Sequence, residues 1–306
     1  MEPKVIVITG PTCSGKTYLS LQIAERLDTE IISADSRQVF KLLTIGTAKP
    51  GIEELYRVKH YFINTLLPDE DFNVSRFESE ALKIIEALHK RGKIPIVVGG
   101  SGLYIKAVVD GIFNTAETDT EYREYLRHII EAGGTNGLYN ELMKVDPSSA
   151  LRMLPQNYKR VMRALEVYHL TGKSITEHHK NYKRGDNISF IQTGLNRERT
   201  LLYENIEIRV DRMLEEGLVN EVKSLLAMGY SKELNALNTV GYKEIISYLN
   251  GETDLHRAIE LIKRNTRRFA KRQMTWFRAD NRIKWFDVAS EQDLTLVANV
   301  IVDLIE

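Results

Sequence analysis

A glycine-rich stretch near the start of the chain has the spacing of a phosphate-binding loop. Residues 10–17, GPTCSGKT, fit the pattern G-x-x-x-x-G-K-[ST]. In such a loop the backbone N–H groups converge on a phosphate, Lys16 adds a point charge, and the Thr17 hydroxyl can hold Mg²⁺. The alternative is a loop that only caps a helix. The pattern predicts a di- or triphosphate ligand, bound by Gly10, Thr12, Cys13, Ser14, Gly15, Lys16 and Thr17.

An aspartate follows the second predicted strand. Residues 30–33 have strand character and lead directly into Asp35. In an open parallel sheet ligands bind at the carboxyl ends of the strands, so Asp35 should emerge beside the phosphate loop. A carboxylate there could be a magnesium ligand or a general base. A helix N-cap is the structural alternative.

An arginine lies on the apolar stripe of a predicted helix over residues 199–216. Arg209 follows Ile206 by three residues and precedes Met213 by four, so all three share one face. A guanidinium aimed along a buried face needs an anion. A structural carboxylate and a substrate phosphate are the two candidates, and the second would make Arg209 part of the site.

The elements around these residues predict an α/β fold, a P-loop NTPase-like parallel sheet flanked by helices. The buried run 5–8 is a strand, and residues 16–27 have helical spacing. An amphipathic helix over 75–91 precedes another buried strand at 94–98. A second glycine turn, 99–102, follows that strand, so the two glycine turns are expected to share one pocket; tight packing is the alternative explanation for this second turn.

The middle of the chain has no strand pattern. Apolar residues recur at helical spacing in 121–131, 136–144 and 155–170, and strand character returns at 188–194. We therefore predict a catalytic core of residues 1–112 and 188–306, with an all-helical insertion at 113–187. Basic residues in the insertion fit either a solvated helix face or contacts to phosphates.

A second basic region lies on the long helix predicted over 254–278. Phe269, Trp276 and Phe277 are interleaved there with many Lys and Arg residues. That pattern is typical of nucleic-acid binding, with a solvated helix as the alternative. Lys+Arg and Asp+Glu both total 42 in 306 residues, so net charge does not decide the question.

Composition sets the remaining expectations. Cys13 is the only cysteine, which excludes an intramolecular disulfide and suits a reducing compartment. No apolar run approaches membrane-spanning length, and the start has no signal-peptide pattern. We expect a cytoplasmic, monomeric protein with no membrane partner. The seven histidines show no convincing metal-ligand spacing.

Several motifs together resemble the tRNA dimethylallyltransferase family. They run in the family's order through nearly the whole chain: residues 10–17, DSRQV at 35–39, IGTAKP at 45–50, GGSGLY at 99–104, RALEV at 163–167, TGK at 171–173, VGYKE at 240–244 and AKRQMTW at 270–276. Three positions depart from the family's usual residues: Cys13 for alanine, Arg37 for an apolar residue, and Phe40 for tyrosine. These changes leave the chemistry intact and bear only on local tRNA contacts.

The resemblance implies an enzyme that moves a dimethylallyl group from its diphosphate to the exocyclic amine of the adenosine 3′-adjacent to the anticodon, with Mg²⁺ as cofactor. The partner would be a tRNA anticodon stem-loop, bound partly by the helical insertion. Asp35 would be the general base, while Lys16 and Arg209 would act on the diphosphate. The residues implied to face tRNA are Asp35, Ser36, Arg37, Gln38, Ser101, Lys159, Arg160, Arg163, Gly241, Tyr242 and Lys243.

Two other functions stay open at this point. A nucleotide-type kinase would use the same loop for ATP, but no strand-borne Walker-B aspartate is evident: Asp110 follows a helix, and Asp287 comes late. A nucleotide-switched RNA-binding protein would explain the basic helices and leave Asp35 without a role.

Overall fold

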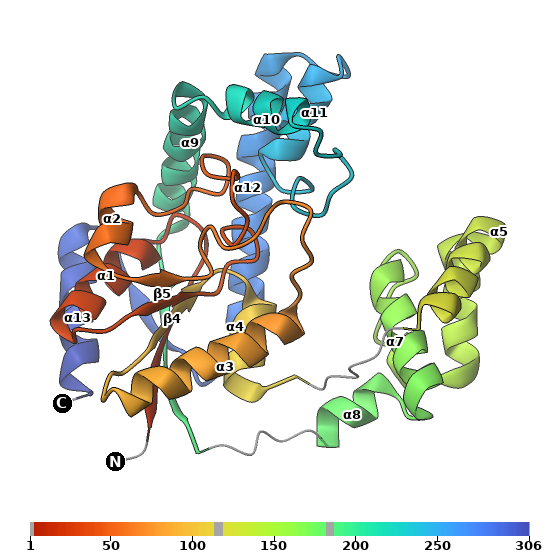
Figure 1. Cartoon of the computed structure of the whole chain (residues 1–306), viewed down its shortest axis with the longest axis horizontal. Coiled ribbons are helices and arrows are strands. Elements are labelled where there is room, and N and C mark those ends of the chain that lie inside the picture. Colours follow the sequence, from red (N-terminus) through yellow and green to blue (C-terminus); the bar gives the residue numbers. More distant parts are fainter. Residues whose placement is uncertain (1–2, 113–118, 182–186, 306) are drawn as a thin grey trace. The chain divides into compact units, whose positions relative to one another are not determined.

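The computed structural model describes residues 3–112, 119–181 and 187–305. The chain divides into two compact units, one of residues 1–109 with 186–306 and one of residues 110–185 (Figure 1). We call them the sheet unit and the helical unit. The predicted boundary at residue 113 lies outside the described residues. No helix in the described ranges is both long and apolar enough to cross a membrane.

The sheet unit is built on a parallel sheet with the strand order β3-β2-β4-β1-β5-β6. The strands are β1 (Lys4–Thr9), β2 (Ile31–Ser33), β3 (His60–Tyr61), β4 (Ile96–Gly99), β5 (Ser189–Asn196) and β6 (Lys284–Asp287). Every pair that these strands form is parallel, so their carboxyl ends meet at one edge. This confirms the predicted α/β class.

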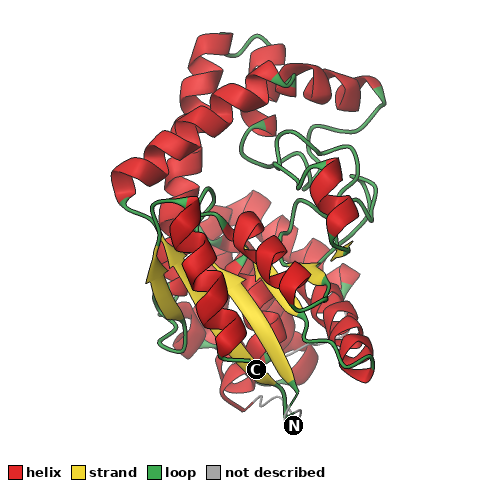
Figure 2. Ribbon diagram, turned by 90° about the vertical axis from the view of Figure 1, so that its left-hand side faces the viewer, coloured by secondary structure: helices red, strands yellow, loops and turns green. Residues whose placement is uncertain are grey.

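Helices cover both faces of this sheet (Figure 2). The helices of the sheet unit are α1 (Lys16–Arg26), α2 (Ile52–Arg57), α3 (Val74–Lys90), α4 (Gly102–Asp110), α9 (Arg199–Glu215), α10 (Leu218–Ala227), α11 (Tyr242–Leu249), α12 (Leu255–Phe277) and α13 (Glu291–Asp303). Side chains alternate along β1: Val5 and Val7 join one core, and Ile6 and Ile8 join the other. Burial on both faces explains why β1 is apolar throughout.

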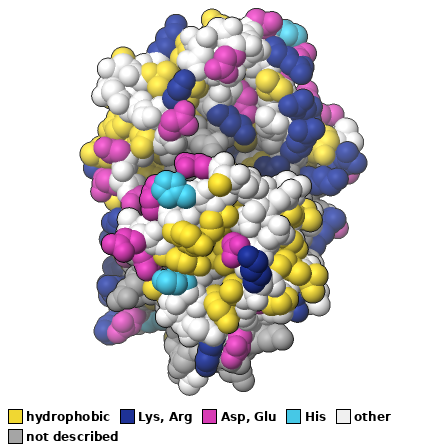
Figure 3. All heavy atoms as spheres, turned by 90° about the vertical axis from the view of Figure 1, so that its right-hand side faces the viewer, with side chains coloured by type: hydrophobic (Ala, Val, Ile, Leu, Met, Phe, Trp, Pro, Cys, Tyr) yellow, Lys and Arg dark blue, Asp and Glu magenta, His cyan; other side chains and the backbone are white. Residues whose placement is uncertain are grey.

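The helical unit has a small core of its own. Its helices are α5 (Thr120–Val145), α6 (Pro147–Ala150), α7 (Tyr158–Thr171) and α8 (Ile175–Asn181). Leu126, Leu138 and Leu165 are buried together there. The two helices predicted over 121–131 and 136–144 are the two parts of α5. They meet at a kink at Gly134, whose φ of 66° is left-handed. Hydrophobic side chains also reach the surface of this unit (Figure 3), and Leu151 is 75% exposed.

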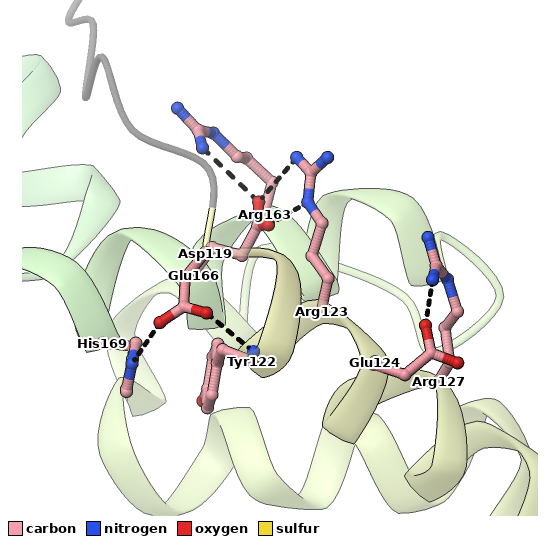
Figure 4. Close-up of polar contacts among 8 residues, drawn as sticks. All are labelled: Asp119, Tyr122, Arg123, Glu124, Arg127, Arg163, Glu166 and His169. Carbon is pink, nitrogen blue, oxygen red and sulfur yellow. Dashed lines mark hydrogen bonds and ion pairs between the residues drawn. The ribbon is translucent and has the colours of Figure 1, made fainter.

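A buried carboxylate links two helices of this unit. Glu166 on α7 is almost fully buried and accepts hydrogen bonds from Arg123 on α5 and from Arg163, one turn earlier on α7 (Figure 4). Asp119 caps α5 through the backbone N–H of Tyr122 and also contacts His169. Paired cations offset the cost of burying the Glu166 charge. Arg163 therefore has a structural partner besides its predicted place at the tRNA.

Candidate active site

A cavity of about 640 Å³ opens at the carboxyl edge of the sheet. Both glycine turns reach it, as does the turn that carries Asp35. Helices α9 and α12 complete the wall. The predicted residues that line it are Thr12, Cys13, Ser14, Gly15, Lys16, Thr17, Asp35, Ser36, Arg37, Gln38, Ser101, Arg209 and Lys243. Gly10 lies at the start of the same loop, next to the end of β1.

The phosphate loop folds tightly between β1 and α1. Gly15 has a φ of +96°, and a Cβ there would lie 2.6 Å from Leu294 Cδ1, so only glycine fits. Lys16 Nζ donates a hydrogen bond to Pro11 O (2.6 Å). The pKa of Lys16 is lowered to about 8, chiefly by burial and also by the nearby Arg209 guanidinium, against the opposing effects of Cys13 and Asp35. Lys16 can therefore lose its charge at only mildly alkaline pH.

This lowered pKa predicts a pH-dependent affinity for diphosphate. The ammonium form of Lys16 attracts the anion, so deprotonation above about pH 8 should weaken inorganic diphosphate binding by up to about tenfold per pH unit. Calorimetric titration between pH 6.5 and 9.5 measures the effect. The ligand also titrates, so the comparison is with Lys16→Met, which should bind weakly and lack the step. An equal decline in Lys16→Met would assign the pH dependence to another group.

Arg209 lies over the phosphate loop. Its Nη1 donates to Thr12 Oγ1 (2.8 Å) and lies 3.9 Å from Cys13 Sγ. Leu202 and Ile206 of α9 are buried beside it, as the helical spacing predicts. No carboxylate among the described residues pairs with Arg209. The described residues therefore do not support the alternative in which Arg209 pairs with a structural carboxylate. The guanidinium lies where it could bind an anion in the loop.

Asp35 projects from the turn after β2 with its two oxygens in different situations. Oδ1 accepts hydrogen bonds from the backbone N–H groups of Arg37 (2.8 Å) and Gln38 (3.3 Å). Oδ2 has no hydrogen-bond partner among the described residues. No helix begins at Asp35, so the N-cap alternative is wrong, although one carboxylate oxygen does hold a turn. The other oxygen is available for a proton or a ligand.

The residues around Asp35 are tied to neighbouring turns. Ser36 N donates to Ser101 Oγ (3.1 Å), which joins the turns after β2 and β4. Gln38 Nε2 reaches the carbonyls of Thr47 and Ala48, and Arg37 Nη1 donates to Asn235 O (2.6 Å). These side chains line the cavity but already have protein partners.

Gln273 on α12 connects the two glycine turns, and the sequence reasoning missed it. Its Oε1 accepts from Thr12 N (2.9 Å), and its Nε2 donates to Gly100 O (2.9 Å). A Cβ on Gly100 would lie 2.1 Å from Nε2, so glycine is required for this approach. In the sequence, Gln273 is one polar residue of a basic helix. Its place within the AKRQMTW motif is the only feature that indicates a role for it.

Glu221 on α10 is a second missed residue. Its carboxylate accepts hydrogen bonds from the backbone N–H groups of Thr44, Ile45 and Gly46 and from the Tyr242 hydroxyl (2.6 Å). It thereby fixes the loop that forms one wall of the cavity.

Tyr242 does not take the place that the sequence predicted for it. It is fully buried, and a Cβ on Gly46 would lie 2.4 Å from its ring. The pKa of Tyr242 is raised, chiefly by burial and then by the Glu221 charge. Its side chain therefore has no surface for tRNA, and its role is to pack and to hold Glu221. Its neighbour Lys243 does line the cavity, while Gly241 turns the chain into α11.

The predicted magnesium site rests on Thr17. Its hydroxyl has no hydrogen-bond partner among the described residues. No group of three or more His, Cys, Asp or Glu residues there could form a metal cage. Mg²⁺ commonly uses one or two protein oxygens together with substrate phosphates and water, so this sparse donor set fits it.

The parallel sheet, the loop at its carboxyl edge and the cations above that loop define an α/β protein of the phosphate-loop class. A family model described as IPP transferase matches residues 38–280. The chain belongs to this family. It is 46% identical over 288 residues to the tRNA dimethylallyltransferase of Halothermothrix orenii, covering 94% of this chain and 88% of that protein.

Solved structures agree with this assignment. The tRNA isopentenylpyrophosphate transferase of Bacillus halodurans superimposes with a TM-score of 0.73 at 40% identity, covering 98% of this chain and 96% of that one. A eukaryotic dimethylallyltransferase acting on tRNA superimposes with a TM-score of 0.77 at 33% identity, covering 93% of this chain and 73% of that one. The resemblance noted in the sequence is confirmed.

Proposed function

We propose that this protein transfers a dimethylallyl group from dimethylallyl diphosphate to the exocyclic amine of the adenosine 3′-adjacent to the anticodon in tRNA, releasing diphosphate. One observation carries the proposal: a single cavity holds a phosphate loop under Arg209 and a carboxylate, Asp35, with one oxygen unbonded. The curated relatives at 41–47% identity bear the name tRNA dimethylallyltransferase.

The loop and its cations suit the leaving group. As the allylic C–O bond breaks, negative charge grows on the diphosphate. Lys16 in the loop and Arg209 beside it would stabilise that charge together with backbone N–H groups of the loop. Ser14 Oγ is buried and has no partner among the described residues, so it is also free to bond an anion. Mg²⁺ on Thr17, when bound, would supply further positive charge to the phosphates.

Asp35 suits the nucleophile. An aromatic amine that attacks the allylic carbon must lose a proton, and Oδ2 is free to accept it. The adenine has to leave its stack to enter a cavity, which costs less in an anticodon loop than in a duplex. This requirement matches the basic surface of α12.

The kinase alternative fits the cavity less well. Neither Asp110 nor Asp287, the Walker-B candidates, is among the described residues that line it. A binding protein without catalysis would leave Oδ2 of Asp35 without a function. Incubating the protein with unmodified tRNA and labelled dimethylallyl diphosphate or γ-labelled ATP tests all three. Transfer from the first substrate alone supports the proposal; transfer from ATP, or from neither, refutes it.

We also propose that the helical unit binds tRNA through Lys159 and Arg160. Both are exposed at the start of α7, and neither has a carboxylate partner among the described residues. Replacing both with Gln should weaken tRNA binding and reduce the slope of log affinity against log salt by about 2, one for each lost phosphate contact.

Filter binding at several salt concentrations measures that slope. Arg127→Gln in the same unit is the control, because Arg127 already pairs with Glu124. An unchanged slope in the double variant would exclude these two residues from the interface.

A further inference from the structure

Phe269 is an aromatic side chain in the cavity wall that the proposed chemistry leaves unused. It lies on α12 and lines the cavity together with Ile262, Thr266 and Gln273. These residues recur at helical spacing, so they form one stripe of α12. The side chain is 39% exposed and belongs to no hydrophobic cluster of the described residues. Part of the ring is therefore open to a ligand in the cavity.

An arginine accompanies this ring. The Arg272 guanidinium carbon lies 5.8 Å from the centroid of Phe269, and Arg272 lines the same cavity. Guanidinium groups and aromatic rings both stack on the faces of nucleobases. A dimethylallyl tail is apolar and gains nothing from a neighbouring guanidinium. The pair favours a base as its ligand.

The charges along α12 support an RNA ligand at this end of the helix. Nearer the start of the helix, Lys263 pairs with Asp211 (2.6 Å) and Arg267 pairs with Glu207 (2.7 Å), both carboxylates being on α9. By contrast, no carboxylate among the described residues pairs with the exposed residues that flank Phe269, which are Arg268, Lys271 and Arg272. The exposed ring is therefore next to basic side chains on the same helix that have no carboxylate partner among the described residues and are available for phosphate contacts.

We propose that Phe269 stacks an unpaired base of the tRNA that is an immediate neighbour of the target adenosine, with Arg272 beside it. The inference rests on the proposed function, because it names the RNA contact of the same site. Stacking the neighbour holds the loop open while the target adenine enters the cavity. Phe269 is thus a positioning residue: it touches the RNA and not the reacting atoms.

The test combines Phe269→Ala with two anticodon stem-loops, each carrying an abasic nucleotide on one side of the target adenosine. Phe269→Ala should weaken binding of the intact stem-loop by about tenfold, because one base loses its stacking partner. Phe269→Tyr should restore binding. Tyr56→Ala, which removes a 92% exposed aromatic on α2, should change nothing. The Phe269→Ala variant should keep the wild-type salt slope, since stacking releases no counterions, whereas Arg272→Gln should lower it.

The abasic loops identify the contact. One of them should bind the wild type about tenfold more weakly than the intact loop and should show no such penalty with Phe269→Ala. Three results would each overturn the proposal. They are equal penalties of the abasic loop with the wild type and with Phe269→Ala, unchanged RNA affinity of Phe269→Ala, and a raised KM of Phe269→Ala for dimethylallyl diphosphate. Failure of the proposed function itself would appear differently, as a wild-type protein that transfers no dimethylallyl group. The RNA-binding measurements decide about Phe269 even then.

Discussion

The Asp35→Asn variant should bind both substrates and lose about 100-fold or more of its turnover. Asparagine can still accept the backbone hydrogen bonds that Asp35 Oδ1 receives from Arg37 and Gln38, so the turn should persist. Asparagine has an amide nitrogen in place of Oδ2, so it cannot accept the proton there. General-base catalysis commonly contributes about 10²- to 10⁴-fold, which sets the size of the expected loss. Single-turnover transfer with saturating tRNA measures it.

The matched control is Asp69→Asn, which removes an exposed carboxylate from a surface loop and should leave turnover unchanged. Calorimetry with inorganic diphosphate and filter binding of tRNA report whether Asp35→Asn still binds. Turnover within a few-fold of the wild type would remove Asp35 from the mechanism. Lost binding with an intact fold would make it a binding residue instead.

Arg209→Ala should weaken dimethylallyl diphosphate binding by about 10- to 100-fold, the usual value of a hydrogen bond to a charged group. The melting temperature without substrate should hardly change, because the hydrogen bonds of the guanidinium go to Thr12 Oγ1 and Cys13 Sγ, and no carboxylate among the described residues would lose an ion pair with it. Arg209→Lys should recover part of the affinity, since an ammonium lacks the planar fork that grips two oxygens. Melting curves with and without the substrate, beside transfer rates, separate these effects.

Arg212→Ala is the control on the same helix. Arg212 is exposed and pairs with Glu216 one turn later, so its loss should alter neither affinity nor rate. A large fall in melting temperature of Arg209→Ala with normal diphosphate affinity would refute a ligand role for Arg209 and point to a structural one.

The strands and helices with a regular apolar period could be predicted from the sequence. The run 5–8, the Ser75–Arg91 helix and the long basic helix appear as β1, α3 and α12 within a few residues. Most of residues 40–72 could not be predicted, because their positions depend on distant partners and not on a local period; the exception is the short strand β3, which the apolar residues at 61–63 indicate. The loop at 44–46 is an example, because its backbone N–H groups donate to Glu221, which lies 175 to 177 positions later in the chain.

The residues of the site likewise include some that could be predicted from the sequence and some that could not. The phosphate loop, Asp35 and Arg209 could be predicted because their residue types and spacing indicate their chemistry. The structure brings them into one cavity. Glu221 and Gln273 could not, because each acts on backbone groups more than 170 residues away. Nothing in a short stretch of sequence distinguishes such a residue from an ordinary surface Glu or Gln. The contacts of Asp35 and Arg209 with substrate stay predictions until the variants are measured.

The hydrogen bonds of Gln273 also bear on when the protein becomes competent during its synthesis. They join Thr12 and Gly100 to a residue that follows them by 261 and 173 positions. Ribosomes deliver the chain from its N-terminus, so both glycine turns emerge well before α12 exists to brace them. Contacts of such long separation close late in folding. A nascent chain should therefore not capture isoprenoid diphosphate, and the ability to bind it should arise only when nearly all of the protein has been made.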